Sequence, residues 1–136
     1  MIKDIPKYVV TDVAIAVIKE SEAEEASETD WSVYLINMKH ENIYGVLVAS
    51  KGYGTYNGED VKTSTLRHFI EDIPAESYAK IEPIQEKLFA ISNEYWISFY
   101  HEGNLYDKKY VFVPESIKEE HFTNIPIINK RGVMIK

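Results

Sequence analysis

The stretch from residue 50 to residue 68, SKGYGTYNGEDVKTSTLRH, holds the densest set of residues that can do chemistry. It contains three of the six glycines, two lysines, an arginine and a histidine, in a chain whose formal net charge is −7. Glycines beside lysines are typical of loops that hold phosphate groups with backbone N–H groups and a cation. The stretch therefore raises the hypothesis of an anion site.

Two nucleotide-binding fingerprints fail on these glycines. A Walker phosphate loop needs its two glycines five residues apart before a lysine, whereas Gly52 and Gly58 are six apart and are followed by Glu59 and Asp60. The dinucleotide fingerprint needs a third glycine where Asn57 stands. The sequence therefore predicts that residues 50–62 form a flexible connection between two strands.

The cationic and hydroxyl residues of this stretch remain a hypothetical ligand-binding or enzymatic site, centred on the segment from Lys62 to His68. A phosphate or a carboxylate is the expected ligand, because a guanidinium group can donate two parallel hydrogen bonds to either. The six candidate residues are Lys51, Lys62, Thr63, Thr65, Arg67 and His68.

No pattern in the sequence predicts a catalytic residue, a metal site or a cofactor. The absence of cysteine excludes disulfides, thiolate catalysis and cysteine-based zinc sites. The histidines share no metal-binding spacing, and His40, His101 and His121 fall at the edges of elements, where we expect exposure. His68 lies on the apolar face of its segment, which favours a hydrogen-bonded core histidine over a catalytic one.

The charge distribution argues against nucleic-acid and membrane partners. Residues 1–68 carry 7 Lys and Arg against 11 Asp and Glu, and residues 69–136 carry 8 against 11. Because basic side chains supply most of the affinity for phosphate backbones and anionic lipids, we expect no binding to DNA or to membranes. The apolar run near the start is about ten residues long, too short for a membrane span. By elimination, the expected location is the cytoplasm.

Seven segments have the alternation and β-branched composition of strands: 8–19, 31–38, 43–50, 62–71, 73–85, 94–101 and 105–113. The first is apolar on both faces, which predicts a strand covered on both sides. Turn residues predict hairpins between 31–38 and 43–50 and around Glu102-Gly103-Asn104. Residues 114–122 predict a short helix, and the acidic residues 20–30 predict a solvated loop.

These segments predict an all-β fold, an antiparallel seven-stranded β-sandwich of the immunoglobulin or fibronectin type, with a short helix near the C-terminus. A small barrel is the alternative. Residues 1–136 are expected to form a single domain, with residues 124–136 as a C-terminal extended tail or last strand. The abundant aromatic residues, including the group at Tyr95 and Trp96, are expected to serve cross-strand packing.

Four segments, SKGY, KTSTLRH, IPAESYAKIE and the closing KRGVMIK, carry a resemblance. With these segments the chain resembles a family of small bacterial proteins of unknown function, over most of its length. Some members of that family are named phenylalanyl-tRNA synthetase subunit, yet the resemblance implies no activity and no catalytic residue. A synthetase catalytic domain needs a far larger sheet with arginines for ATP, which 136 residues of this pattern cannot form.

Three hypotheses for function follow. The first is a non-catalytic, cytoplasmic interaction or accessory domain, which binds a protein partner or a second copy of itself through edge strands or the tail. The second is the anion-binding site or enzyme described above. The third and weakest is association with RNA or a tRNA synthetase, which rests on the name found in the family alone.

Overall fold

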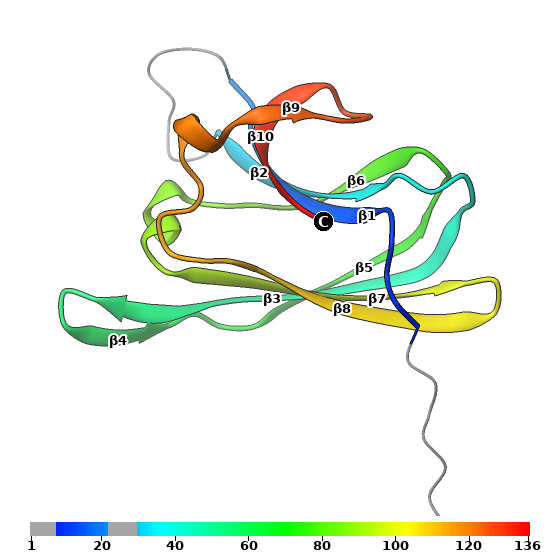
Figure 1. The fold of residues 1–136 in the computed structure, drawn as a ribbon. Helices are drawn as coiled ribbons and strands as arrows, with labels where there is room; N and C mark the ends of the chain where they lie inside the picture. Colours follow the sequence, from blue (N-terminus) through cyan, green and yellow to red (C-terminus); the bar gives the residue numbers. More distant parts are fainter. Residues whose placement is uncertain (1–7, 22–29) are drawn as a thin grey trace, which may run out of the picture.

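The computed structural model describes residues 8–21 and 30–136, which form two antiparallel sheets stacked face to face (Figure 1). The first sheet has the strand order β6-β2-β1-β10-β9, and the second has the order β4-β3-β7-β8, with β5 also paired to β3. The strands are β1 (Val13–Lys19), β2 (Trp31–Asn37), β3 (Ile43–Tyr56), β4 (Glu59–Lys62), β5 (Leu66–Ile73), β6 (Ser77–Pro83), β7 (Ser92–His101), β8 (Asn104–Phe112), β9 (Thr123–Ile125) and β10 (Lys130–Ile135).

The all-β, antiparallel, two-sheet architecture confirms the coarse prediction of fold class, but the count of seven strands is wrong. The described residues form ten strands, because residues 59–62 add β4 and residues 123–135 add β9 and β10. The immunoglobulin or fibronectin type stays a prediction. Of the predicted acidic loop at 20–30, residues 22–29 lie outside the described residues.

The glycine-rich stretch is not the flexible connection that the sequence predicted. Strand β3 runs through it as far as Tyr56, and β4 returns along β3 after a two-residue turn. Asn57 and Gly58 have positive φ of 51° and 79°, which match the tight hairpin turn that an Asn-Gly pair favours. The stretch is therefore a β-hairpin, which extends beyond the first sheet in Figure 1.

The predicted hairpin between residues 31–38 and 43–50 is wrong, because its two strands lie in different sheets. Strand β2 pairs with β1 and β6, whereas β3 pairs with β4, β5 and β7. Alternating sequence predicts strands but not their partners, and the intervening link crosses from one layer to the other. The other predicted hairpin, β7 to β8 around Glu102 and Gly103, is confirmed.

In residues 8–21 and 30–136, helical structure is limited to two short 3-10 helices, η1 (Glu86–Ala90) and η2 (Glu119–His121). The helix predicted for residues 114–122 is therefore wrong in extent, because only the last residues of that segment form a helical turn. Within the described part of the chain, no helix has the length and apolar character needed to cross a bilayer.

Strand β1 is buried on both faces, as predicted for this segment, although it begins only at Val13. Ile15 and Val17 belong to the core between the two sheets, and Ala16 and Ile18 belong to a second apolar cluster with Ile125. The second cluster exists because the β9–β10 hairpin, which continues the first sheet beyond β1, brings Ile125 against the outward-facing side chains of β1. The first sheet is thus covered on both sides at its centre.

A buried hydrogen bond joins the two sheets across the core. The hydroxyl group of Tyr110, on β8, donates to the backbone carbonyl of Val13, on β1, at 2.6 Å, and both residues are buried. The bond spans 97 residues of sequence. It fixes how the edge strand of the second sheet lies against the centre of the first.

Replacing Tyr110 with phenylalanine should lower the free energy of unfolding by about 1–2 kcal/mol, because the buried carbonyl loses its hydrogen-bond donor. Urea denaturation measures this change. The control is Tyr56→Phe, at an exposed tyrosine, for which we expect a change within about 0.5 kcal/mol. Equal midpoints for Y110F and the wild type would contradict the role assigned to this bond.

Candidate functional site

The six residues predicted as a ligand site do not converge on one surface. Arg67 and His68 lie on opposite faces of β5, since Arg67 pairs with Ala49 and is exposed, whereas His68 pairs with Val48 and is half-buried. Lys62, at the end of β4, and Thr65 are exposed. The cations of this segment therefore fan out along the sheet.

Lys51 and Thr63 are the two candidates that lie together, beside Gly52. The Gly52 N–H donates to Thr63 Oγ1 at 2.7 Å, and the Thr63 N–H donates to the Gly52 carbonyl at 2.9 Å. A hollow of about 240 Å³ is lined in part by Lys51, Thr63 and the carboxylate of Glu82. A Cβ on Gly52 would lie 3.0 Å from Ile91, so this glycine serves packing. The anion-site hypothesis stays a prediction.

The ammonium group of Lys51 is drawn instead to a carboxylate on the outer face of the second sheet. Glu94, on β7, has a side chain only 10% exposed, and its oxygens lie 3.7 Å from Lys51 Nζ and 3.9 Å from Lys109 Nζ. The hydroxyl group of Tyr53 donates to the same carboxylate at 3.2 Å. Four side chains from β3, β7 and β8 thus form a cluster in which the lysines offset the negative charge of Glu94.

His68 faces the interior, as predicted, but its buried Nε2 has no hydrogen-bond partner among the described residues. The nearest acidic group is a carboxylate of the other sheet. His68 Nε2 lies 3.5 Å from Glu82 Oε2, on β6 of that sheet. Glu82 also neighbours Tyr95 on β7, and burial, together with this carboxylate, raises the pKa of the Tyr95 phenol. The three side chains link the two sheets along the side where β5 and β6 lie.

The expectation that His101 is exposed is wrong. His101 is 8% exposed and ends β7, packed against the ring of Tyr106 with centroids 5.9 Å apart. His40 and His121 are exposed, as expected. The burial of His101 follows from the sheet alternation, which points the residue after Tyr100 toward the core side.

The outer face of the second sheet is unusually apolar. Six large apolar side chains, each 45–63% exposed, lie on this side of β3, β5, β7 and β8. Cross-strand pairing brings them together: Leu47 pairs with Phe69, and Tyr100 pairs with both Tyr44 and Leu105. We call this surface the aromatic face; it comprises Tyr44, Leu47, Phe69, Trp96, Tyr100 and Leu105.

A bulge in β3 shapes the aromatic face. The register of β3 against β7 shifts between Tyr44 and Leu47, and Gly45 has a φ of 56°. A Cβ on Gly45 would lie 3.3 Å from the ring of Tyr100, so the ring lies over the glycine backbone. The bulge therefore keeps Tyr44 and Leu47 on the same face although they are three residues apart.

A larger hollow, with a volume of about 720 Å³, is lined by residues of η1 and of the segment 115–122. Figure 1 shows these two segments at one end of the sandwich. Trp31, Phe89 and Phe122 form the apolar wall of the hollow. Its lining includes three lysines and three glutamates, so it has no net charge with which to select an anion. None of the six predicted residues lines it.

Comparison of the chain with protein-family models, curated proteins and solved structures gives no match. The functional argument therefore rests on the geometry of this chain.

The aromatic face carries no sequence motif, so motif reasoning missed it. Its signal was present as alternation in YWISFYH, where Trp96 and Tyr100 alternate with Ile97 and Phe99. A strand with apolar residues on both faces predicts cover on both sides. In the described part of the chain, other residues cover only one side of β7. The uncovered side of β7 belongs to the aromatic face.

The buried phenol of Tyr95 should make stability fall at alkaline pH. Its pKa is raised in the folded protein, so its contribution to stability is complete below about pH 10, the pKa of an exposed tyrosine, and is lost as pH rises above that value. Between about pH 10 and 11, Tyr95→Phe should reduce the loss of unfolding free energy by about 1 kcal/mol, and above about pH 11 the difference in slope approaches about 1.4 kcal/mol per pH unit.

Denaturation at a series of pH values measures this slope, and lysine ionisation cancels in the comparison with wild type. Tyr56→Phe, at an exposed phenol, is the control and should leave the slope unchanged. A Tyr95→Phe slope equal to that of the wild type would show that the phenol titrates normally in the folded state.

Proposed function

We propose that this protein is a non-catalytic, cytoplasmic interaction domain that pairs with a second copy of itself through the aromatic face. The main evidence is that six large apolar side chains, each about half exposed, lie together on the outer side of the second sheet. Contiguous apolar patches of this kind mark interaction surfaces in soluble proteins. Sandwiches of the immunoglobulin and fibronectin type, the predicted architecture, are a common frame for such domains.

The size of the aromatic face suits a two-chain interface. Fully buried side chains of this class remove about 150–250 Å² each from solvent, so six half-exposed ones offer roughly 500–700 Å². One partner of a standard interface contributes about 800 Å². The rim of polar side chains around the six can supply the remainder.

Three residues of the aromatic face, Leu47, Phe69 and Trp96, and their cross-strand neighbours form a self-complementary arrangement. Two neighbouring rows of cross-strand partners run across the sheet. The first row is Phe69, Leu47, Ser98 and Asp107, and the second is Arg67, Ala49, Trp96 and Lys109. In a symmetric dimer, a twofold axis can lie in the plane of contact, between the two rows and along them. This axis exchanges the rows, so that each residue of one copy faces, on the other copy, its neighbour from the other row.

The exchange pairs unlike partners along the whole length of the rows. Asp107 of one copy faces Lys109 of the other, which forms two equivalent ion pairs across the interface. Trp96 faces the small side chain of Ser98, and Phe69 faces the guanidinium of Arg67, a favourable cation–π arrangement. Trp96 lies within these rows. Tryptophan is one of the residue types that most often contribute a large share of the binding energy of an interface.

Charge also favours this surface for pairing of like chains. The chain has a formal net charge of −7, so most approaches of two copies are opposed by repulsion. On the face itself, the positive charges of Lys51 and Lys109 lie beside the negative charge of Glu94. Arg67 and Asp107 add one charge of each sign. The aromatic face therefore lets two acidic chains approach without placing like charges in contact.

The C-terminal tail, residues 124–136, is the other partner-binding element expected from the sequence. It offers fewer unpaired backbone groups to a partner strand. Strand β10 pairs with β1 along one edge, and β9 occupies its other edge at residues 130–132. Association with RNA stays a prediction that no feature of the described residues favours.

Light scattering coupled to size-exclusion chromatography tests the proposal. The wild type should show twice the 15.7 kDa mass of one chain at high concentration and dissociate on dilution. Asp107→Lys places two lysines opposite each other, and Lys109→Asp places two aspartates opposite each other, so each single exchange should weaken the dimer by about tenfold or more.

The double exchange, D107K with K109D, restores opposite charges across the axis and should recover most of the dimer. Lys80→Asp, at an exposed lysine on the other sheet, is a control for change of net charge and should leave the dimer intact. A wild type that stays monomeric at all concentrations would disprove pairing, and a double exchange no better than the singles would disprove this axis.

A further inference from the structure

The β2–β3 link and the β7–β8 turn lie at the same end of the sandwich (Figure 1). A buried histidine with unused ring nitrogens ends β7 there. His101 is 8% exposed, and both Nδ1 and Nε2 are buried without a hydrogen-bond partner among the described residues. An imidazole ring must present at least one donor and, when neutral, one acceptor. A buried ring with both positions unused is costly unless something else engages it.

Two carboxylates stand over the same nitrogen. His101 Nε2 lies 3.8 Å from Glu41 Oε1 and 3.9 Å from Glu102 Oε1. These separations are too long for hydrogen bonds, which end near 3.2 Å. The three atoms lie within 4.8 Å of one another, the spacing of groups that can hold one ion between them.

The geometry points to a site for one divalent transition-metal ion of the zinc class, with Nε2 of His101 and one oxygen each from Glu41 and Glu102 as ligands. Zinc bonds to nitrogen and oxygen are about 2.0–2.2 Å long, which places two tetrahedral ligands roughly 3.4 Å apart. The observed separations of 3.8 and 3.9 Å need to close by only a few tenths of an ångström.

The two exposed glutamates can make that movement, because their side chains are 54% and 71% exposed. The histidine cannot move far, since it is held in the protein interior beside Tyr106. The site thus combines one fixed ligand with two adjustable ones. The fourth tetrahedral position faces the exposed carboxylates and would take a water molecule.

The backbone around the glutamates is also fixed. The buried Asn37 donates its side-chain amide to the carbonyls of Glu41, Ile73 and Pro74, at 3.0 to 3.2 Å, and accepts from the N–H of Lys39 at 3.0 Å. These bonds hold the β2–β3 link that presents Glu41.

The opposite glutamate lies in the β7–β8 turn. Glu102 and Gly103 have positive φ of 51° and 77°, the conformation of a tight hairpin turn. This turn directs the glutamate that follows His101 back toward the imidazole ring. The β2–β3 link between the sheets and the β7–β8 turn of the second sheet are therefore brought to one point, and a bound ion would join them.

The ligand set selects among ions. Mg²⁺ and Ca²⁺ prefer sites made of oxygen ligands alone, whereas imidazole suits zinc, cobalt, nickel and copper. We therefore expect Zn²⁺ and Co²⁺ to bind and Mg²⁺ and Ca²⁺ to bind far more weakly. This site is independent of the aromatic face, so it can be present whether or not the chain pairs.

Titration of the full, untagged chain with Zn²⁺ in a calorimeter tests the site, with Co²⁺ absorption as a second readout of tetrahedral coordination. The wild type should bind one equivalent, and Zn²⁺ at about 100 times Kd should raise Tm by roughly 10 °C. Glu41→Gln and Glu102→Gln should each weaken binding by about tenfold or more, since a charged ligand is lost. Both positions are exposed, so neither variant should compromise folding.

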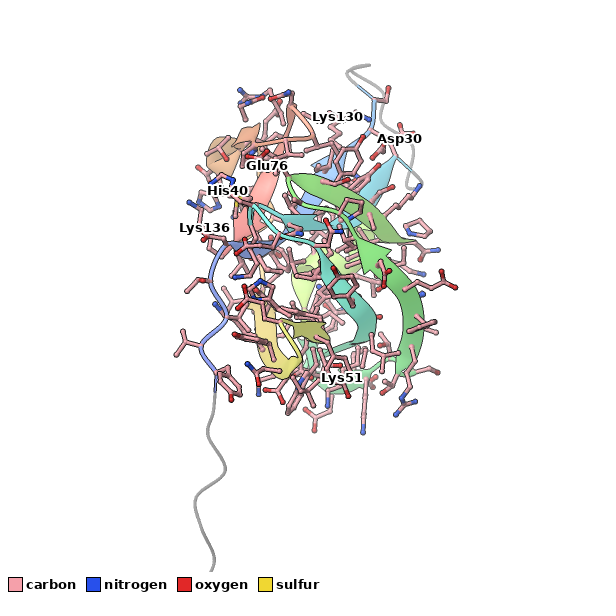
Figure 2. All side chains as sticks on the ribbon, turned by 90° about the vertical axis from the view of Figure 1, so that its right-hand side faces the viewer. Asp30, His40, Lys51, Glu76, Lys130 and Lys136 are labelled. Carbon is pink, nitrogen blue, oxygen red and sulfur yellow. The ribbon has the colours of Figure 1, made fainter. Side chains whose placement is uncertain are left out.

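His101→Gln should abolish the Co²⁺ spectrum. The matched control is His40→Gln, since His40 is an exposed histidine whose Nδ1 lies 3.4 Å from a single carboxylate, that of Glu76 (Figure 2). H40Q should bind like the wild type. No stoichiometric Zn²⁺ binding by the wild type, equal loss in H40Q and E102Q, or equal affinity for Mg²⁺ and Zn²⁺ would each overturn the assignment.

Discussion

The apolar layer between the two sheets is the constraint on which the rest of the structure depends. Each strand must turn one set of alternate side chains into this layer, because burying large apolar groups supplies most of the stabilisation of a domain of this size. Once Ile97 and Phe99 point inward, Trp96 and Tyr100 must point outward. Strand geometry allows no other arrangement. The aromatic face is therefore a direct consequence of the core on the opposite side of the same strand.

The two sheets differ in how their outer faces are covered. The β9–β10 hairpin continues the first sheet, and its Ile125 packs with apolar side chains of β1 and β2 in a second cluster. Among the described residues, nothing equivalent covers the second sheet, whose outer side keeps Trp96 and Phe69 half exposed or more. Pairing with a second copy would give the second sheet the cover that the first sheet receives from its own chain.

Buried polar groups are concentrated at the margins of the core, where turns and edges meet. Asn37 satisfies its amide with backbone carbonyls, Glu94 is compensated by lysines, and the phenol of Tyr110 bonds across the core. Three side chains of the described residues depart from this rule: Trp31 Nε1 and His68 Nε2 have no hydrogen-bond partner, and in His101 both ring nitrogens are unpaired. Because buried polar groups are almost always paired, an exception held in place by well-satisfied neighbours indicates a ligand.

The sequence by itself determined the all-β class, most of the strand segments and the inward position of His68, because these depend on alternation along the chain. The tertiary structure alone decided which strands pair, that β2 and β3 part into separate sheets, and that Arg67 and His68 face opposite ways across one strand. It also decided that Glu41 meets His101, although sixty residues of chain separate them. Local pattern specifies which side of a strand is apolar. Only the packing of distant segments specifies what lies against that side.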